Sequence, residues 1–146
     1  MKVMVAITGT GADEDKIEPT PEMFEAMGAY NEELVKAGIM LDGQGLLPSA
    51  KGARVIFERG NTSVVDGPFT ESKELIAGYW IWQVDSLEEA VEWAKRCPSD
   101  PLSGHTSTLE IRQIAEMEDF GDAYTPEAAE RDARLAEEIK AQHPDA

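Results

Sequence analysis

Two N-capped amphipathic helices, each placed between short extended segments, restrict this chain to a small set of mixed helix-and-sheet architectures. The first helix is predicted to begin at Thr20-Pro21, because Thr is a favourable N-cap and Pro fits the first helical turn. Its apolar side chains recur at helical spacing along one face and are Met23, Met27, Tyr30 and Leu34. The second helix begins after Ser86, which forms a capping box with Glu89, and it ends before Pro98, where a loop follows.

The extended segments surround these helices in a definite order. Apolar or alternating runs bounded by Gly, Pro and polar residues predict strands over 2–8, 39–47, 53–58, 62–66, 78–84 and 109–114. The two central segments flank Arg59-Gly60-Asn61 and are expected to form a hairpin. Without this inserted hairpin the order is the β-α-β-β-α-β pattern of a ferredoxin-like α+β fold.

A ferredoxin-like sheet places both helices on one face and leaves the other face uncovered. We expect the uncovered face to carry Val, Ile, Trp and Leu side chains, which a monomer would not leave in water. Homodimerisation through this face is the simplest way to cover it.

Charge limits the partners of the chain. It has 146 residues, with 13 Lys plus Arg against 29 Asp plus Glu and a net charge of −16. Such a surface repels nucleic acid and anionic lipid, so we expect neither to bind. The single Cys97 excludes an internal disulfide framework, and the N-terminus does not resemble a signal peptide. We therefore expect a cytoplasmic protein.

The last quarter of the chain differs in composition. Residues 115–146 contain ten acidic and three basic residues, and a third helix with a thin apolar stripe is predicted after Thr125-Pro126. We divide the chain into a ferredoxin-like domain over 1–114 and an acidic helical extension over 115–146. The extension either supports solubility and dimer formation or binds a basic protein partner.

Few residues have the spacing that metal or cofactor sites need. The only histidines, His105 and His143, lie far apart in the sequence, and Gly9-Thr10-Gly11 is followed by acids where a phosphate would bind. We expect no metal and no cofactor. His105 is a candidate acid or base in the loop before the last strand, and the alternative is an exposed loop histidine.

The most informative stretch runs from Asp66 to Tyr79, DGPFTESKELIAGY. Gly and Pro fix a turn, the Asp66 carboxylate can accept hydrogen bonds from backbone N–H groups, and Phe69 can anchor the turn in the core. Three charged side chains follow, Glu71, Lys73 and Glu74. A rigid corner with a capping aspartate accounts for much of this pattern, and a polar binding site is the alternative.

This stretch resembles the signature of the DGPF subgroup of YCII-related (YciI-like) proteins. The opening KVMVAITG, the first helix with the Gly-x-Gly-Leu-x-Pro strand after it, and the last strand LEIR are similar to the same subgroup, so the resemblance covers about residues 2–114. It implies a ferredoxin-like fold, a homodimer with its sheets packed into a dimeric α+β barrel, and a cleft at the sheet and subunit boundary.

The resemblance also bears on catalysis. In the YciI branch a histidine on the first helix and a nearby aspartate are suggested as catalytic. Here Tyr30 occupies that helical position, so the histidine is missing, and Asp42 is the nearest acid after the helix. A few relatives act on chlorinated aromatic compounds. DGPF proteins are commonly encoded beside extracytoplasmic-function sigma factors, which implies a regulatory association.

Two functional hypotheses follow. The first is a non-catalytic homodimeric module, linked to sigma factors or transcription regulation and able to bind a protein partner. The second is a small-molecule binder or enzyme that uses general acid/base chemistry in the cleft. Catalytic candidates are Asp42, Asp66 and His105, and ligand-binding candidates are Tyr30, Asp66, Phe69, Glu71, Lys73 and Tyr79.

Overall fold

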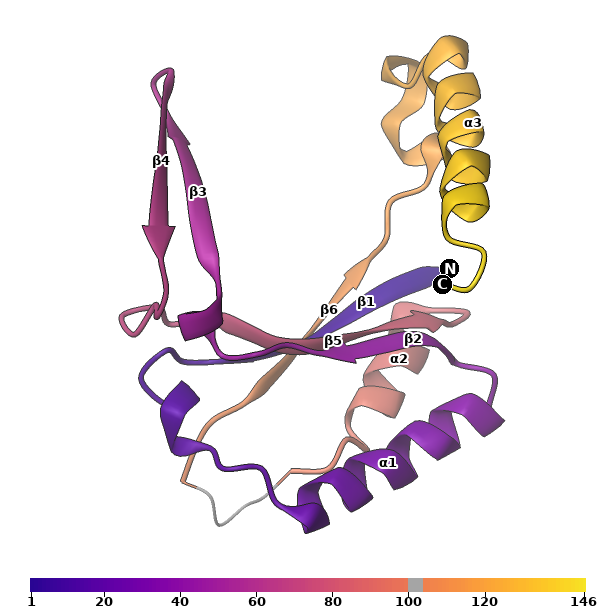
Figure 1. Ribbon diagram of the computed structural model, residues 1–146. Helices are drawn as coiled ribbons and strands as arrows, with labels where there is room; N and C mark the ends of the chain where they lie inside the picture. The colour runs from indigo at the N-terminus through magenta and orange to yellow at the C-terminus, as the bar shows by residue number, and fades with distance from the viewer. Residues whose placement is uncertain (100–103) are drawn as a thin grey trace. The chain divides into compact units, whose positions relative to one another are not determined.

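The computed structural model describes residues 1–99 and 104–146, and Figure 1 shows its elements. The chain forms two compact units, Met1–Ile114 and Ala115–Ala146. The first unit contains, in order, β1 (Lys2–Gly9), η1 (Glu14–Lys16), α1 (Pro21–Lys36), β2 (Met40–Gly45), η2 (Ser49–Lys51), β3 (Ala53–Glu58), β4 (Asn61–Asp66), β5 (Leu75–Gln83), α2 (Leu87–Ala94) and β6 (Thr108–Gln113). The second contains η3 (Met117–Ala123) and α3 (Pro126–Gln142). Residues 100–103 of the loop predicted after Pro98 lie outside the described residues.

Four strands form one antiparallel sheet in the spatial order β2-β5-β1-β6. The central strands β1 and β5 pair so that Val3 lies opposite Trp82 and Val5 lies opposite Trp80. Strands β3 and β4 form a separate two-stranded sheet, inserted between β2 and β5. This topology confirms the predicted ferredoxin-like α+β fold with an inserted hairpin.

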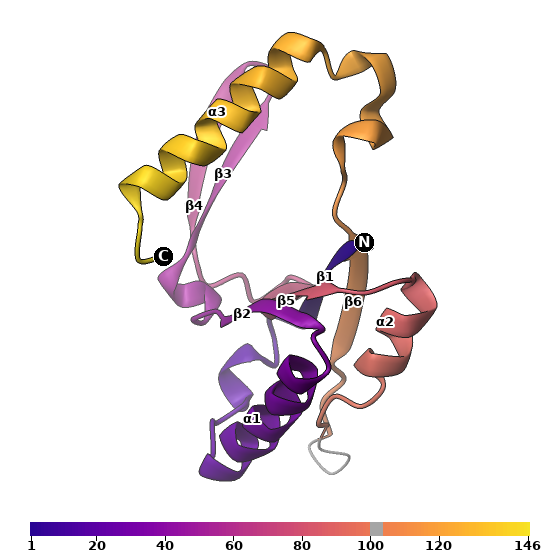
Figure 2. The same ribbon diagram turned by 90° about the vertical axis from the view of Figure 1, so that its right-hand side faces the viewer.

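Both helices of the first unit lie on the same face of the four-stranded sheet (Figures 1 and 2). Their caps follow from the sequence, since Thr20 Oγ1 accepts from the Met23 N–H at 3.2 Å and Ser86 Oγ accepts from the Glu89 N–H at 3.1 Å. Between helices and sheet lies the apolar core, which includes Val3, Val5, Leu34, Trp80, Trp82 and Ala90. Fully burying a side chain of the size of Val or Leu contributes roughly 1.5–3 kcal/mol.

The opposite face of the sheet differs from the expectation. Trp80 and Trp82 pack in the helix-side core, so the prediction that Trp side chains line the uncovered face is wrong. Trp80 and Trp82 are two residues apart on one strand, so their side chains point to the same face of the sheet. That face is the one covered by the helices, where the core lies. We call the opposite face of the sheet the open face. The strand register places Met4, Ala6, Tyr79 and Ile81 at its centre, with no Trp side chain among them.

The strand ends also differ from the sequence prediction. Strand β2 is shorter than the predicted 39–47, and β5 begins three residues before the predicted Gly78. The early start of β5 follows from β1, whose last residues Thr8 and Gly9 pair with Ile76 and Leu75 beyond a bulge.

In the second unit, α3 begins as predicted, because Thr125 Oγ1 accepts from the Ala128 N–H at 3.2 Å. Among the described residues, no helix has both the length and the apolar character needed to cross a membrane.

Candidate functional site

The DGPF turn is held between two other segments of the first unit. The Gly11 N–H donates to the Ser72 carbonyl at 2.8 Å, and the Gly67 N–H donates to the Gly52 carbonyl at 3.0 Å. Backbones approach so closely here that a Cβ on Gly67 would lie 1.7 Å from the Ser49 carbonyl oxygen. Glycine is therefore required by packing at this position, and the turn forms a rigid corner.

A partly buried hydrogen-bond chain crosses the corner. The Glu14 carboxylate accepts from the Ser49 N–H at 2.5 Å and from the Ser49 hydroxyl at 2.6 Å. The same hydroxyl oxygen accepts from the Phe69 N–H at 3.0 Å. One carboxylate on η1 thus fixes η2, and η2 in turn fixes the DGPF turn.

Arg54, at the base of the hairpin, completes the corner. Its guanidinium lies 3.8 Å from the centroid of the Phe69 ring and donates from Nη2 to the Ser72 hydroxyl at 2.8 Å. Phe69 is only 7% exposed, as expected for a side chain that anchors the turn in the core. The cation over the ring ties β3 to the residues after β4.

These residues surround a surface pocket of about 340 Å³, which we call the corner pocket. It is lined by Glu14, Leu47, Ser49, Arg54, Phe69, Glu74, Leu75 and Ile76. The lining combines apolar walls with one guanidinium and two carboxylates. Both oxygens of Glu14 are already engaged with Ser49, which gives this carboxylate a structural role. The arrangement suits a small ligand that has an apolar part and a polar part.

Most of the predicted DGPF candidates lie outside this pocket. Phe69 lines it, whereas Asp66, Glu71 and Lys73 are exposed and are not among the lining residues. Asp66 ends β4 opposite Ala53. The corner pocket therefore includes Phe69, the apolar anchor of the motif, and none of the three charged candidates.

Tyr30 lies on α1 in the core, 4% exposed. Its hydroxyl donates to the Trp93 carbonyl at 2.6 Å, and its ring meets Trp80 edge-on at 5.9 Å between centroids. Burial raises the pKa of this phenol above its usual range. The hydroxyl is thus part of the contact between the two helices and is not directed to the corner pocket.

The candidates Tyr79 and Asp42 belong to the open face. Tyr79 is half-buried on β5, and Asp42 lies at the edge of the same face, opposite Ile81. Asp42 Oδ1 accepts from the Gly43 N–H at 2.8 Å and from the Gln44 amide at 3.3 Å. Its carboxylate therefore stabilises its own strand.

His105 forms a cluster with residues that the sequence analysis did not select. Its Nδ1 lies 3.5 Å from Asp13 Oδ1, and the Thr10 hydroxyl donates to Asp13 Oδ2 at 2.8 Å. The hydrogen bond from Thr10, followed by that from Lys16, lowers the pKa of the Asp13 carboxyl. This carboxylate is therefore ionised at neutral pH and orients the imidazole of His105.

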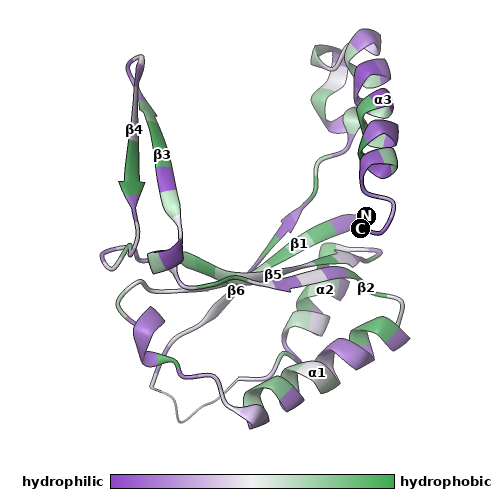
Figure 3. Ribbon diagram, in the orientation of Figure 1, coloured by the Kyte–Doolittle hydropathy of each residue, from purple (hydrophilic) through white to green (hydrophobic). Residues whose placement is uncertain are grey.

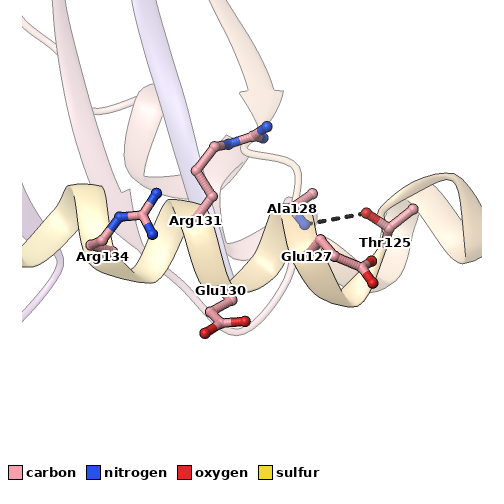
Figure 4. Close-up of a pocket in the computed structure, with 6 residues that line it drawn as sticks. All are labelled: Thr125, Glu127, Ala128, Glu130, Arg131 and Arg134. Atoms are coloured by element: carbon pink, nitrogen blue, oxygen red, sulfur yellow. Dashed lines mark hydrogen bonds between the residues drawn. The ribbon is translucent and has the colours of Figure 1, made fainter.

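The second unit presents a different concavity, shown in Figure 4. It measures about 430 Å³ and is lined by Thr125, Glu127, Ala128, Glu130, Arg131 and Arg134. All six come from α3 and its N-cap, and the marked hydrogen bond is the cap itself. This is the charged flank of one helix, with Glu127 and Glu130 followed by Arg131 and Arg134.

Sequence reasoning missed the residues that build the corner, namely Glu14, Ser49 and Arg54. Glu14 and Ser49 are 35 positions apart, and neither stands in a motif. Within the described residues, no group of three or more His, Cys, Asp and Glu side chains is placed to hold a metal ion.

The sheet order, the two helices on one face and the inserted hairpin define a ferredoxin-like α+β protein. The YCII-related domain matches residues 1–118, and the chain belongs to this family. It is also similar to an uncharacterized protein of Rhizobium meliloti (strain 1021), with 30% identity over 98 residues, 67% of this chain and 77% of the relative.

Proposed function

We propose that this chain is a non-catalytic homodimeric module of the YCII-related family that works by association. The observation that carries the proposal is the open face. Its centre is apolar. Met4, Tyr79 and Ile81 are half-buried there, and Ala6 is buried. Around it, in register, lie exposed polar side chains: Lys2, Asp42, Gln44, Gln83, Glu110 and Arg112.

An apolar centre inside a polar rim is the usual anatomy of a protein interface. The rim contains both signs of charge, so a two-fold arrangement can bring Lys2 or Arg112 of one copy near Asp42 or Glu110 of the other. The dispersal of the candidate carboxylates supports association rather than catalysis. Acid/base catalysis needs such groups to converge on one pocket, and Asp42 and Asp66 do not line the corner pocket.

Sedimentation velocity tests the proposal on three forms of the full chain. Wild type should sediment as a dimer, and Ile81→Lys should sediment as a monomer because it places a charge at the centre of the open face. Val35→Lys is the matched control, since Val35 is a 61% exposed apolar residue on α1, away from this face. Circular dichroism confirms that each variant is folded. A monomeric wild type, or a dimer that survives Ile81→Lys, contradicts the proposal.

A regulatory partner is the second part of this proposal. The resemblance to the DGPF subgroup favours a sigma factor, and the acidic α3 unit would bind one of its basic surfaces. Binding of a sigma factor from the same host should weaken when Glu130, Glu137 and Glu138 are changed to Gln. It should also weaken steeply with added salt, since exposed charges are screened. If neither the substitutions nor added salt weaken binding, α3 does not bind the sigma factor through its acidic side chains.

A second candidate function is small-molecule binding in the corner pocket, favoured by the Arg54 guanidinium beside apolar walls. Native mass spectrometry of protein purified from its own host shows whether a molecule is retained. Retention by wild type and its loss in Leu75→Ala, with the fold intact, would support this function. An empty protein would leave the association proposal as the account of the molecule.

A further inference from the structure

The inserted hairpin is the least covered part of the first unit. Every residue of β3 and β4 is exposed, and the two strands form a sheet of their own. An isolated two-stranded hairpin is only marginally stable in water, because it has no further layer on which to bury its apolar side chains. Figure 3 shows hydrophobic residues along both of its strands.

One side of the hairpin is distinctly apolar. Val55 pairs with Val64, and Phe57 pairs with Thr62, so these side chains share one face. Val55, Phe57 and Val64 are 54%, 79% and 65% exposed. We call these three residues the arm face. Ile56, between two of them on β3, points to the opposite side.

The base of the hairpin is fixed, whereas its outer part has no further contact layer. The Arg54 guanidinium lies over the Phe69 ring and donates a hydrogen bond to the Ser72 hydroxyl. The Gly67 N–H donates to the Gly52 carbonyl. These contacts hold the hairpin on the side of the sheet that carries the open face, opposite α1 and α2 (Figure 1). A copy packed on the open face would therefore lie on the same side of the sheet as the hairpin.

Charge favours a second copy of this chain as the occupant. Residues 51–66 contain three basic and two acidic side chains, although the whole chain has a net charge of −16. The hairpin is thus a segment that another acidic copy does not repel. A strongly basic partner would be attracted to other acidic surfaces of the molecule before this one.

We propose that the hairpin is an arm that packs its Val55, Phe57 and Val64 side chains onto a second copy of this chain. The inference rests on the homodimer proposed above and adds a second contact to it.

Phe57→Ser tests the arm, and Ile56→Ser is its matched control on the same strand but the other face. Sedimentation equilibrium gives the dimer dissociation constant of each full-length variant. Phe57→Ser should raise it by at least about tenfold, as expected for an aromatic contact residue, while Ile56→Ser should change it by no more than about threefold. Hydrogen exchange provides an independent readout: the β3 and β4 amides should be protected in the dimer and lose protection on dilution.

The outcomes separate the arm from the dimer. A dimeric wild type with an unchanged dissociation constant in Phe57→Ser overturns the arm and leaves the open-face dimer standing. Equal weakening by both variants also overturns it, because the effect would then not belong to one face. A monomeric wild type contradicts the proposed homodimer and the arm together.

Discussion

The four-stranded sheet and the inserted hairpin are built from similar residues but are stabilised in opposite ways. In the sheet, Val3, Val5 and Trp82 are fully buried beneath the helices. In the hairpin, Val55, Phe57 and Val64 are also β-branched or aromatic, yet each is more than half exposed. Both regions are therefore made of residues with high strand propensity. Only the sheet has a second layer, so only the sheet is stable by its own packing.

This difference separates a part of the molecule that is stabilised by its own packing from a part that, in our proposal, associates with a second copy. A layer of helices converts apolar strand residues into a core, whereas the absence of a layer leaves them available to another molecule. Substitutions in the two regions should therefore affect different quantities. Core changes should lower the free energy of unfolding, and hairpin changes should alter local opening and association.

Trp82→Ala should have the largest effect. Trp82 is fully buried and its ring lies 5.8 Å from that of Trp80, between centroids. Removing the indole leaves a large cavity and should lower the free energy of unfolding by about 3–5 kcal/mol, measured by urea denaturation. Phe57→Ala, the comparison in the hairpin, should change it by less than about 1 kcal/mol in dilute protein. Equal losses would mean that the two regions do not differ as described.

The rigid corner joins the two regions, and Gly67→Ala should be the next largest change. Its new Cβ would collide with the Ser49 carbonyl, so the backbone must shift at a cost of about 1–3 kcal/mol in unfolding free energy. Gly45→Ala is the control, because a Cβ added there would meet nothing within 4 Å and the φ of Gly45 lies outside the left-handed region. It should stay within about 0.5 kcal/mol of wild type. If Gly67→Ala leaves the free energy of unfolding unchanged, the backbone at the corner shifts at little cost and the corner is not rigid.

The core also contains a titratable group whose effect has a definite sign. Burial, reinforced by Cys97, raises the pKa of Tyr30 in the folded chain. Above pH 10, approximately, the unfolded chain loses this proton while the folded chain keeps it, so the unfolded state binds fewer protons. The free energy of unfolding should therefore fall as pH rises beyond that point, by at most about 1.4 kcal/mol per pH unit.

Tyr30→Phe provides the control for this titration. It should lower stability at neutral pH by about 1 kcal/mol, since the hydrogen bond to the Trp93 carbonyl is lost. It should also flatten the alkaline decline measured by urea denaturation at a series of pH values. An identical decline in the variant would assign the effect to another group, such as the Cys97 thiol, whose pKa burial also raises.

Local signals in the sequence predicted the elements well. Thr20 and Ser86 cap the helices where expected, because capping depends on residues within one turn. The side of the sheet that each strand residue faces was harder to predict. Alternation shows that Trp80 and Trp82 share a face, but it does not show which face the helices cover. The open face was therefore expected to be more hydrophobic than it is.

The corner pocket shows why the candidate site could be predicted only in part. The sequence marked Phe69 and the glycines around it, since turns have local signatures. The bond between Glu14 and Ser49, and the Arg54 guanidinium over Phe69, join segments that are distant in the chain. Single residues without periodicity or motif carry no signal of such long-range contacts. Two charged residues of the same stretch, Glu71 and Lys73, were predicted as ligand-binding candidates, but the structure leaves both exposed to solvent.

Gly60→Ala should have the smallest effect on global stability and gives the sharpest comparison of the two regions. Gly60 has a φ of +81° at the tip of the hairpin, a conformation that Ala adopts only with strain of about 1 kcal/mol. That strain should speed hydrogen exchange at the β3 and β4 amides. Exchange at the β1 and β5 amides, and the free energy of unfolding, should remain within about 0.5 kcal/mol of wild type, because an exposed hairpin opens without disturbing the core. If the β1 amides exchange faster by the same factor, the hairpin and the core unfold as one unit, and the division between a folding region and an associating region is wrong.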